Sequence, residues 1–404
     1  MTKRPTKIAF IGAGSVEFTR NLIGDILDFP ELRGVELALH DIDAGRLESA
    51  EGMARLVARE RGASPAVTVH ADRRAAIEGA DHVINMVQIG GHESTLPDFR
   101  IPARYGLRQT IADTLGIGGI FRALRTAPHM LALGREMAEL CPRAWLLNYT
   151  NPMAMLCWLI YGGTPTTQVV GLCHSVQYTV EQLAGLVGVP ADEEVQRRVR
   201  VALYRRLRYY QTESSEHAAE YVPWFMRHDS ELERYRIPVD EYVRRSERNL
   251  SRYHEMRQAV ERGDMGGLER SNEYASIIIR AMETGEPAVI YGNVRNDDLL
   301  PGLPDGCCVE VPCLVDGTGL RGVPVPEYPP ELAALNRTYV NVVELTVRAV
   351  LEQRPQLVRQ AAMLDPNTAA TLTLDEIDAL CDDLTAAHAD LLPPALAAAS
   401  KELV

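Results

Sequence analysis

The first residues with a chemical signature form the turn Gly12-Ala13-Gly14-Ser15, near the start of a chain of 404 residues. Glycines let a backbone turn tightly and let a pyrophosphate approach the N-terminus of the helix that follows. An acid after the next strand can accept hydrogen bonds from the adenosine ribose, and Asp41 stands there, with Asp43 as the second choice. The predicted dinucleotide-binding residues are Gly12, Gly14, Ser15 and Asp41.

This turn departs from the full dinucleotide-binding fingerprint, because Glu17 occupies the position of the third glycine. A glycine turn by itself also fits an ordinary tight turn. The order of strand, turn, helix, strand and acid around it favours the dinucleotide interpretation. No basic residue stands at Asp41 to hold a 2′-phosphate, so we predict NAD rather than NADP.

Three more polar clusters follow apolar runs further along the chain. They are residues 85–91, residues 148–151 and Cys173-His174-Ser175. Ligands of open parallel sheets bind at the carboxyl ends of the strands. These clusters are therefore the candidates for a second part of the same ligand site.

The apolar pattern predicts the elements that must position these residues. Short apolar runs predict strands at residues 7–11, 35–39, 67–70, 81–87, 145–148 and 168–172. Other stretches predict helices at 18–27, 121–140, 152–161 and 176–186. Strands that alternate with helices favour a parallel, doubly wound sheet. The predicted fold class is α/β, with an N-terminal Rossmann-like domain.

The alternation fades after about residue 190. Helices are predicted at 196–210, 232–262, 268–283, 332–351 and 374–387, and strands at 289–293 and 308–312. This mixture is typical of an α+β domain. We therefore predict an NAD-binding Rossmann-like domain over residues 1–190 and a C-terminal α+β domain for substrate binding or oligomerisation over residues 191–404.

The composition restricts the class of protein and of partner. With 46% hydrophobic and 24% charged residues, the chain is an ordinary globular protein. Its net charge of −13 disfavours nucleic-acid binding, because phosphates are repelled. Its seven cysteines lack the paired spacing of a structural zinc site, and reduced thiols fit a cytoplasmic protein. No uninterrupted apolar segment predicts a membrane span. We expect a small-molecule partner.

Taken together, these clusters and others along the chain resemble glycoside hydrolase family 4, in its α-galactosidase and α-glucosidase-like branch. The resemblance covers nearly the whole chain. The matching segments are Gly12-Ala13-Gly14-Ser15, Ile84-Asn85-Met86-Val87-Gln88, Gln109-Thr110-Ile111-Ala112-Asp113-Thr114-Leu115-Gly116, Asn148-Tyr149-Thr150-Asn151-Pro152-Met153, Gly171-Leu172-Cys173-His174-Ser175-Val176-Gln177, Thr212-Glu213-Ser214-Ser215-Glu216-His217, Glu220-Tyr221, Tyr291-Gly292-Asn293-Val294 and Val309-Glu310-Val311-Pro312.

The resemblance implies an architecture like that of lactate and malate dehydrogenases, and a homodimer or homotetramer. It implies NAD and Mn²⁺, or another divalent metal, as cofactors. In the mechanism of the family, NAD⁺ oxidises the sugar C3 hydroxyl, the metal polarises the oxygens at C2 and C3, and a base removes the C2 proton. The aglycone leaves by elimination, water adds back, and NADH reduces the ketone. This redox-neutral cycle is an exception to hydrolysis by two carboxylates.

The resemblance also implies roles for Cys173 and His174. Cys173 would bind the metal, and His174 would protonate the leaving group, since imidazole titrates near neutrality. Without the resemblance, Cys173 would be interpreted as a buried structural thiol and His174 as a hydrogen-bonded residue of the cleft wall.

Three further residues match the sugar-binding part of the family. Asn151 would orient the substrate, although it could equally cap a helix that begins at Pro152. Tyr274 matches the base of the family, which requires that a cation lower the tyrosine pKa from about 10; otherwise it is a packed aromatic residue. Asp113 is expected to contact the substrate and to take part in catalysis. The set is completed by Asn148 for substrate binding and Asn85 for cofactor binding.

The sequence departs from the family at the second metal ligand, a histidine in a Gly-Ile-Asn-His segment. No histidine lies between His174 and His217. Val195 is followed almost directly by the helix at Arg198-Val199-Arg200, so we interpret this point as the place where a block of some tens of residues is absent. His217 could supply a replacement nitrogen. A site with one protein ligand would bind metal weakly.

We therefore expect an enzyme that hydrolyses unphosphorylated α-glycosides, with α-galactosides first and α-glucosides or α-glucuronides next. Two alternatives stay open. A 2-hydroxy-acid dehydrogenase of the lactate or malate type shares the glycine turn and the sheet, and would produce NADH. An NAD-binding pseudoenzyme or sensor would fit the absent histidine.

Overall fold

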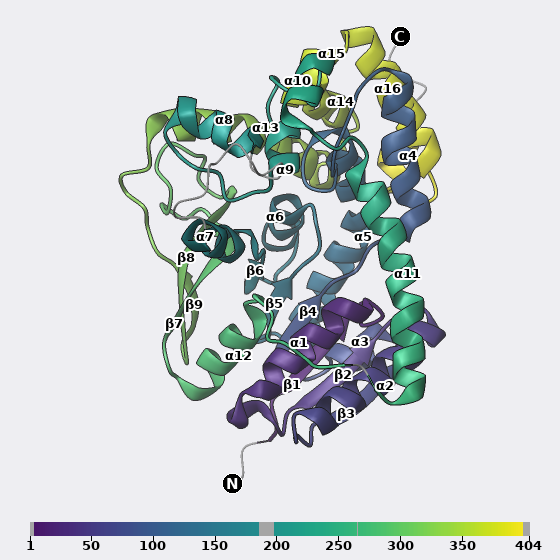
Figure 1. Ribbon diagram of the computed structural model, residues 1–404, viewed down its shortest axis with the longest axis vertical. Helices are drawn as coiled ribbons and strands as arrows, with labels where there is room; N and C mark the ends of the chain where they lie inside the picture. Colours follow the sequence, from purple (N-terminus) through teal and green to yellow (C-terminus); the bar gives the residue numbers. More distant parts are fainter. Residues whose placement is uncertain (1–3, 186–197, 265, 399–404) are drawn as a thin grey trace.

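The structure, a computed structural model, describes residues 4–185, 198–264 and 266–398. In these residues nine strands form one sheet, in the order β3-β2-β1-β4-β5-β6-β7-β8-β9 (Figure 1). The strands are β1 (Lys7–Ile11), β2 (Glu36–His40), β3 (Ala66–His70), β4 (His82–Asn85), β5 (Trp145–Asn148), β6 (Val169–Gly171), β7 (Ala288–Arg295), β8 (Cys308–Asp316) and β9 (Gly319–Gly322).

The first six strands are parallel, and all of them except the edge strand β3 are largely buried on both faces. In β1, Ile8 and Phe10 join one hydrophobic core, while Ala9 and Ile11 join the other. This explains why the strand is a continuous apolar run rather than an alternating one. The sequence order of the strands reverses between β1 and β4, which is where such sheets bind ligands. The predicted α/β fold class is confirmed.

Helices cover both faces of the sheet (Figure 1). They are α1 (Val16–Asp28), α2 (Ala44–Glu60), α3 (Arg73–Ile77), α4 (Gly91–Arg104), α5 (Gly116–Leu140), α6 (Met153–Gly163), α7 (Ser175–Gly185), α8 (Arg198–Leu207), α9 (Ser215–Glu220), α10 (Asp229–Tyr235), α11 (Glu241–Arg262), α12 (Ala275–Thr284), α13 (Pro330–Leu351), α14 (Gln356–Leu364), α15 (Pro366–Thr371), α16 (Leu374–His388) and α17 (Pro394–Ala397), with a short 3₁₀ helix, η1 (Pro30–Leu32).

Within residues 4–185, 198–264 and 266–398, three hydrophobic clusters hold these layers together. Helices α1, α2 and α12 pack on one face of the sheet, and α5, α6, α13, α14 and α16 pack on the other. A smaller core joins α8 and α9 through residues such as Val199, Leu203 and Ala218. The C-terminal helices thus bury their apolar faces against the helices of the first half of the chain.

Strands from the second half of the chain extend the same sheet. Gly171 of β6 pairs with Asn293 of β7 in antiparallel fashion, and β8 and β9 continue that pattern. The α+β character predicted for the second half therefore arises partly from an antiparallel edge on the parallel sheet. The predicted domain boundary between residues 190 and 191 lies outside the described residues, and it stays a prediction.

Two predicted helices of the second half are wrong in extent. The predicted helix 232–262 is divided into α10 and α11, because Arg236 and Asp240 have positive φ angles of 49° and 60° on either side of Pro238. The helix predicted at 268–283 begins only at Ala275. The apolar pattern did not predict α2 or α4, and α4 contains Pro97 and Pro102. Among the described residues, no helix is both long and apolar enough to cross a membrane.

Candidate active site

The glycine turn lies at the carboxyl end of β1 and is held against the end of β2. The N–H groups of Gly12 and Ala13 donate to the carbonyl of His40, over 3.0 and 2.9 Å. Gly12 has a φ of +87°, which glycine adopts without steric cost. Ser15 occupies the N-cap position of α1 and makes no capping bond, so the helix N-terminus keeps N–H donors for an anion.

Asp41 closes the turn from the end of β2. Its Oδ2 accepts a hydrogen bond from the N–H of Gly14 over 2.8 Å, and its Oδ1 accepts one from Asp43 over 3.0 Å. A β-carbon at Gly14 would lie 2.6 Å from both Asp41 Oδ2 and Arg46 Cβ, so a side chain has no room there. This tight turn fits a dinucleotide. Asp43, the second choice, instead caps α2 by accepting from the N–H of Arg46.

Asn85 and Asn148 are the last residues of the neighbouring parallel strands β4 and β5, and their side chains are hydrogen-bonded to each other. The Nδ2 of Asn85 donates to Asn148 Oδ1 over 2.9 Å and to Thr150 Oγ1 over 3.1 Å, and the Nδ2 of Asn148 donates to the carbonyl of Thr150 over 2.9 Å. Both side chains are completely buried. In this arrangement they hold the turn that leads to Asn151, while their predicted contacts with cofactor and substrate stay predictions.

Asp113 and Asn151 come together from separate segments. Asn151 Nδ2 donates to Asp113 Oδ2 over 3.1 Å, and the hydroxyl of Thr114 donates to Asp113 Oδ1 over 2.8 Å. Asn151 does not cap a helix, because α6 begins at Met153 with Pro152 in the N-cap position. The amide of Asn151 instead fixes the carboxylate of Asp113, so the two residues form one polar unit.

Cys173 follows β6, and acidic side chains surround it. Its Sγ lies 3.0 Å from Ser175 Oγ, and Ser175 Oγ donates to Glu213 Oε2 over 3.4 Å. Burial, followed by the negative charges of Glu213 and Glu310, raises the pKa of the Cys173 thiol. Without a cation beside it, the thiol therefore keeps its proton.

Glu310 of strand β8 is an acid flanked by the buried residues Val309 and Val311, and it lies near Cys173. Among the described residues its Oε1 is buried and has no hydrogen-bond partner. Burial and the charge of Glu213 raise the pKa of Glu310 to about 8. Buried oxygens of this kind are satisfied by cations or by protons. In the described chain no three His, Cys, Asp or Glu side chains are gathered closely enough to hold a metal ion by themselves. The acidic surroundings of Cys173 thus fit a divalent cation that takes part of its ligands from elsewhere.

His174 lies at the surface next to Cys173 and contacts Glu273. Its Nδ1 lies 3.1 Å from Glu273 Oε1, and its side chain is 55% exposed. The hydrogen bond with Glu273 raises the pKa of His174, although burial opposes the shift. A protonated imidazole can donate a proton, which is compatible with the predicted role as an acid.

Tyr274 is buried and occupies the N-cap position of α12. Burial raises its pKa, although hydrogen bonds with Gln177 and the backbone of Tyr291 oppose the shift. As it stands, Tyr274 is therefore a weaker acid than a free tyrosine. A role as base requires a nearby positive charge, as the sequence analysis anticipated.

His217, the predicted replacement for the absent metal ligand, contacts two side chains of its own helix and its C-cap. Its Nδ1 lies 2.9 Å from the hydroxyl of Tyr221 and 3.4 Å from Glu220 Oε1. Burial lowers its pKa, but the hydrogen bond with Glu220 and the charges of Glu213 and Asp113 outweigh burial and raise the pKa to about 9. A protonated imidazole does not bind a metal, so a cation would have to displace this proton, and the role of His217 as a replacement ligand stays a prediction.

Two residues of this region were missed by the sequence analysis. Arg122 of α5 donates from Nε to the carbonyl of Asn151 over 3.2 Å and from Nη1 to the hydroxyl of Tyr242 over 2.9 Å. Its only signal was a charge inside an apolar helix. Glu310 had the same signal, in an apolar strand. A charged residue inside an apolar helix or strand is thus a sequence signal that indicates a candidate site residue.

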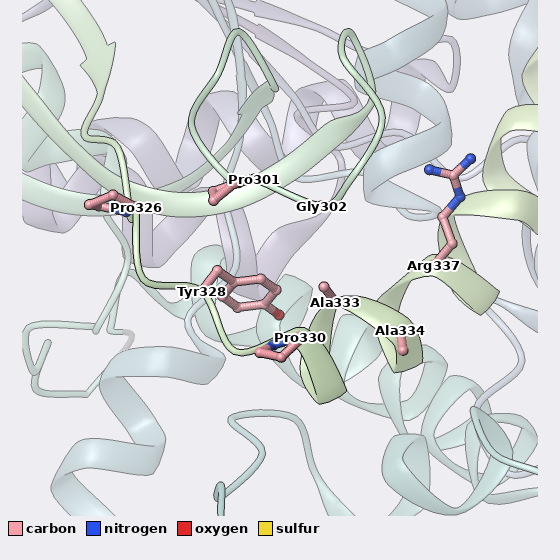
Figure 2. A pocket seen from close by; sticks show the side chains of 8 residues that line it. All are labelled: Pro301, Gly302, Pro326, Tyr328, Pro330, Ala333, Ala334 and Arg337. Carbon is pink, nitrogen blue, oxygen red and sulfur yellow. The ribbon is translucent and has the colours of Figure 1, made fainter.

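A surface hollow elsewhere contains none of the candidate residues. It is lined by Pro301, Gly302, Pro326, Tyr328, Pro330, Ala333, Ala334 and Arg337, at the start of α13 (Figure 2). Its lining is mainly proline and alanine, with one cation. The hollow offers neither an acid nor a nucleophile, and it is separate from the site described here.

Comparisons with known proteins identify the family. Models of the family 4 glycosyl hydrolase and of its C-terminal domain match residues 7–189 and 175–368. An α-galactosidase of Bacillus subtilis is 42% identical over 96% of this chain and 99% of its own length. The chain belongs to glycosyl hydrolase family 4. The predicted membership of this family is therefore confirmed, and the 2-hydroxy-acid dehydrogenase alternative is not favoured.

Two further proteins show how far the likeness extends. An α-galactosidase of Rhizobium meliloti is 33% identical over 96% of this chain and 89% of its own length. A 6-phospho-α-glucosidase from gut microorganisms, solved in complex with NAD and Mn²⁺, has the same fold, with a TM-score of 0.77 over 96% of this chain and 99% of that chain, at 17% identity.

The Bacillus alignment also bears on chain length. It extends over 431 positions, more than the 404 residues present here, so the relative contains residues that nothing in this chain matches. The point after Val195 at which we predict an absent block lies outside the described residues.

Proposed function

We propose that this member of family 4 is an α-galactosidase that depends on NAD and on a divalent metal. The observation that carries the proposal is the 42% identity to an α-galactosidase along nearly its whole length. The arrangement of the residues supports it, because a dinucleotide-type turn follows β1 and a polar unit suited to sugar hydroxyls follows β5, at the carboxyl ends of parallel strands in one sheet. α-Glucosides and α-glucuronides are the next candidates.

The dinucleotide would lie at the carboxyl end of β1. The N–H groups at the start of α1 would face the pyrophosphate, and Asp41 would accept hydrogen bonds from the ribose. Gly14 keeps this approach open, because a β-carbon there would meet Asp41. Bound NAD supplies a hydride acceptor, and later a hydride donor, for the sugar C3 atom. Asn85, at the end of the adjacent strand β4, donates hydrogen bonds to Asn148 and Thr150 and so fixes the backbone next to the proposed dinucleotide site.

The sugar would lie over Asp113 and Asn151. A carboxylate accepts hydrogen bonds from sugar hydroxyls, and an amide both donates and accepts them. Because Asn151 already holds Asp113 Oδ2, the two side chains present a fixed pattern to the ring. Holding the ring in one orientation is a large part of what such a site contributes to the rate.

The metal would be held at Cys173, among the negative charges of Glu213 and Glu310. A divalent cation supplies the positive charge that acidifies the sugar C2 proton. Tyr274 would remove that proton, and His174, whose pKa is raised by Glu273, would protonate the departing aglycone oxygen. These roles follow from the family pattern and from the positions of the side chains around β6 and α12.

The test is hydrolysis of an aryl α-galactoside with NAD⁺, Mn²⁺ and a thiol reductant, with each omitted in turn. The proposal expects activity that is lost without NAD⁺ or without metal, and no net formation of NADH. Net NADH formation would indicate a dehydrogenase instead. A protein that binds NAD but leaves galactoside, glucoside and glucuronide intact would be the pseudoenzyme that the absent histidine allows.

A further inference from the structure

Glu220 is a buried carboxylate at the C-terminal end of α9 that binds a loop of the proposed site. Its Oε2 accepts hydrogen bonds from the N–H groups of Thr110 over 2.8 Å and Ile111 over 3.1 Å. Its Oε1 accepts one from Ala112 over 3.0 Å. Three consecutive backbone N–H groups therefore converge on one charged side chain. Hydrogen bonds to an ionised acceptor are about twice as strong as neutral ones, so this contact can set the path of the loop.

The loop needs such a contact, because its backbone is strained next to the proposed substrate residue. Ala112 has a φ of +49°, in the left-handed region that is sterically unfavourable for a residue with a β-carbon. The loop also packs tightly on the first turn of α5, where a β-carbon at Gly118 would lie 2.7 Å from the carbonyl oxygen of Ala112. Directly after this turn, Asp113 meets the amide of Asn151.

Other contacts of the loop hold its edges rather than this turn. The carbonyls of Gln109 and Thr110 accept hydrogen bonds from the N–H groups of Asp240 and Tyr242, at the start of α11. The hydroxyl of Thr110 donates to the carbonyl of Glu216 over 2.9 Å. Only the Glu220 side chain binds the N–H groups of residues 110–112 together, among the contacts of the described residues.

We propose that Glu220 is a positioning residue: its carboxylate holds residues 110–112 in the path that presents Asp113 to the sugar. Glu220 acts through Asp113 and does not touch the substrate. The proposal rests on the proposed function in one respect, because it takes Asp113 as a substrate contact. It assigns a task to the Glu220-Tyr221 segment, for which the sequence analysis had none.

The experiment compares Glu220→Ala and Glu220→Gln with the control Glu216→Gln in the full-length protein. Glu216 lies on the same helix and is similarly buried, but its side chain faces Arg245 over 3.6 Å. Amide hydrogen exchange of residues 110–112, the NAD dissociation constant, and kcat and KM for an aryl α-galactoside are measured for each variant. Glu220→Ala is repeated in an Asp113→Asn background.

We expect Glu220→Ala to speed amide exchange at residues 110–112 by about 100-fold, which corresponds to ~2.7 kcal/mol. We expect kcat/KM to fall about 100-fold while NAD binding changes less than about twofold. Glu220→Gln keeps one acceptor oxygen and should lose about tenfold, and Glu216→Gln should match the wild type. In the Asp113→Asn background Glu220→Ala should cost little more, because both changes remove the same contact.

Unchanged exchange at residues 110–112 in Glu220→Ala would overturn the proposal. So would a full additional loss of kcat/KM in the Asp113→Asn background, since a merely structural residue acts independently of Asp113. If the wild-type protein leaves α-galactosides intact, the proposed function fails, while the exchange measurement still decides whether Glu220 holds the loop.

Discussion

The glycine turn and the segment around Cys173 both follow parallel strands, β1 and β6, yet they differ in how they are built. The turn is made of residues adjacent in the sequence, and its N–H groups donate hydrogen bonds to the carbonyl of His40 and the carboxylate of Asp41. Around Cys173, by contrast, Glu213 and Glu310 come from distant segments of the chain. The hydrogen bonds of the glycine turn are thus satisfied within the protein, while acidic side chains are concentrated around Cys173.

This difference indicates which half depends on a ligand. Every polar group of Asp41 described here has a partner, but Glu310 keeps one buried oxygen without any among the described residues. A site in which acidic side chains lie close together is stabilised when a bound cation supplies the opposite charge. We therefore expect NAD binding to be robust and catalysis to be sensitive to the metal.

The largest effect should come from Cys173→Ala. Removing the thiol should lower the affinity for Mn²⁺ by more than about 100-fold and abolish most hydrolysis, because the site has few other metal-binding groups. The NAD dissociation constant should stay within about twofold. Metal titration followed by Mn²⁺ electron paramagnetic resonance measures this effect. Cys141→Ala, which removes a buried thiol at the end of α5, is the control; equal losses in both variants would contradict a metal role.

Gly14→Ala should disrupt the other half. A β-carbon there would lie 2.6 Å from Asp41 Oδ2, so the turn must open, and NAD affinity should fall about 100-fold, or ~2.7 kcal/mol. Mn²⁺ binding should be retained. Gly34→Ala, at a glycine with open space around it, is the matched control. Calorimetric titration with NAD⁺ tests this, and wild-type affinity in Gly14→Ala would place the dinucleotide elsewhere.

Breaking the contact between Asp113 and Asn151 should affect the sugar alone. Asp113→Asn and Asn151→Ala should each lower kcat/KM for an aryl α-galactoside by about 10- to 100-fold, with NAD affinity unchanged. The double variant should lose much less than the product of the two losses, because the side chains act as a unit. Strictly multiplicative losses would show that the two residues work independently.

The smallest effect concerns stability and pH. The pKa of His217 is about 9 in the folded protein, above its ordinary value of 6.5. The protonated side chain therefore stabilises the fold fully below pH 6.5, and this contribution is lost as the pH rises through 9. His217→Gln should flatten the decline in Tm between pH 6.5 and pH 9 by a few degrees, since 1 kcal/mol corresponds to roughly 2–4 °C in a large domain.

The matched control for this prediction is His254→Gln, which alters an exposed imidazole on α11. Thermal unfolding followed by circular dichroism at both pH values gives the comparison. A pH dependence in His217→Gln as steep as that of the wild type would mean that His217 is not the group responsible.

The sequence alone predicted those elements whose bounds depend on the local pattern of apolar residues. The strands Lys7–Ile11 and Trp145–Asn148 have the predicted bounds, because continuous apolar runs end at turn residues. The extents of α10, α11 and α12 were not predictable in this way. Helical periodicity continues across residues 232–262, and the break at Arg236 and Asp240 arises where the backbone of Asp240 binds the carbonyl of Gln109, far away in the sequence.

The site followed the same division. Asp41 and the glycine turn were found by spacing, whereas the contact between Asp113 and Asn151 joins segments 38 residues apart and required the structure. Asn85 and Asn148 were predicted as ligand contacts from the sequence; the fold adds the hydrogen bond between the two amides, which joins residues 63 positions apart. The sequence therefore predicts which chemical groups are present, whereas the fold determines which groups lie within hydrogen-bond distance of one another.

The measurement that tests the central claim most directly is hydrolysis of an aryl α-galactoside in D₂O with NAD⁺ and Mn²⁺, followed by mass spectrometry of the galactose. If Tyr274 removes the C2 proton and solvent replaces it, the product should carry one deuterium on carbon at C2. Galactose formed without deuterium on carbon would contradict the claim, because it would mean direct displacement at the anomeric carbon.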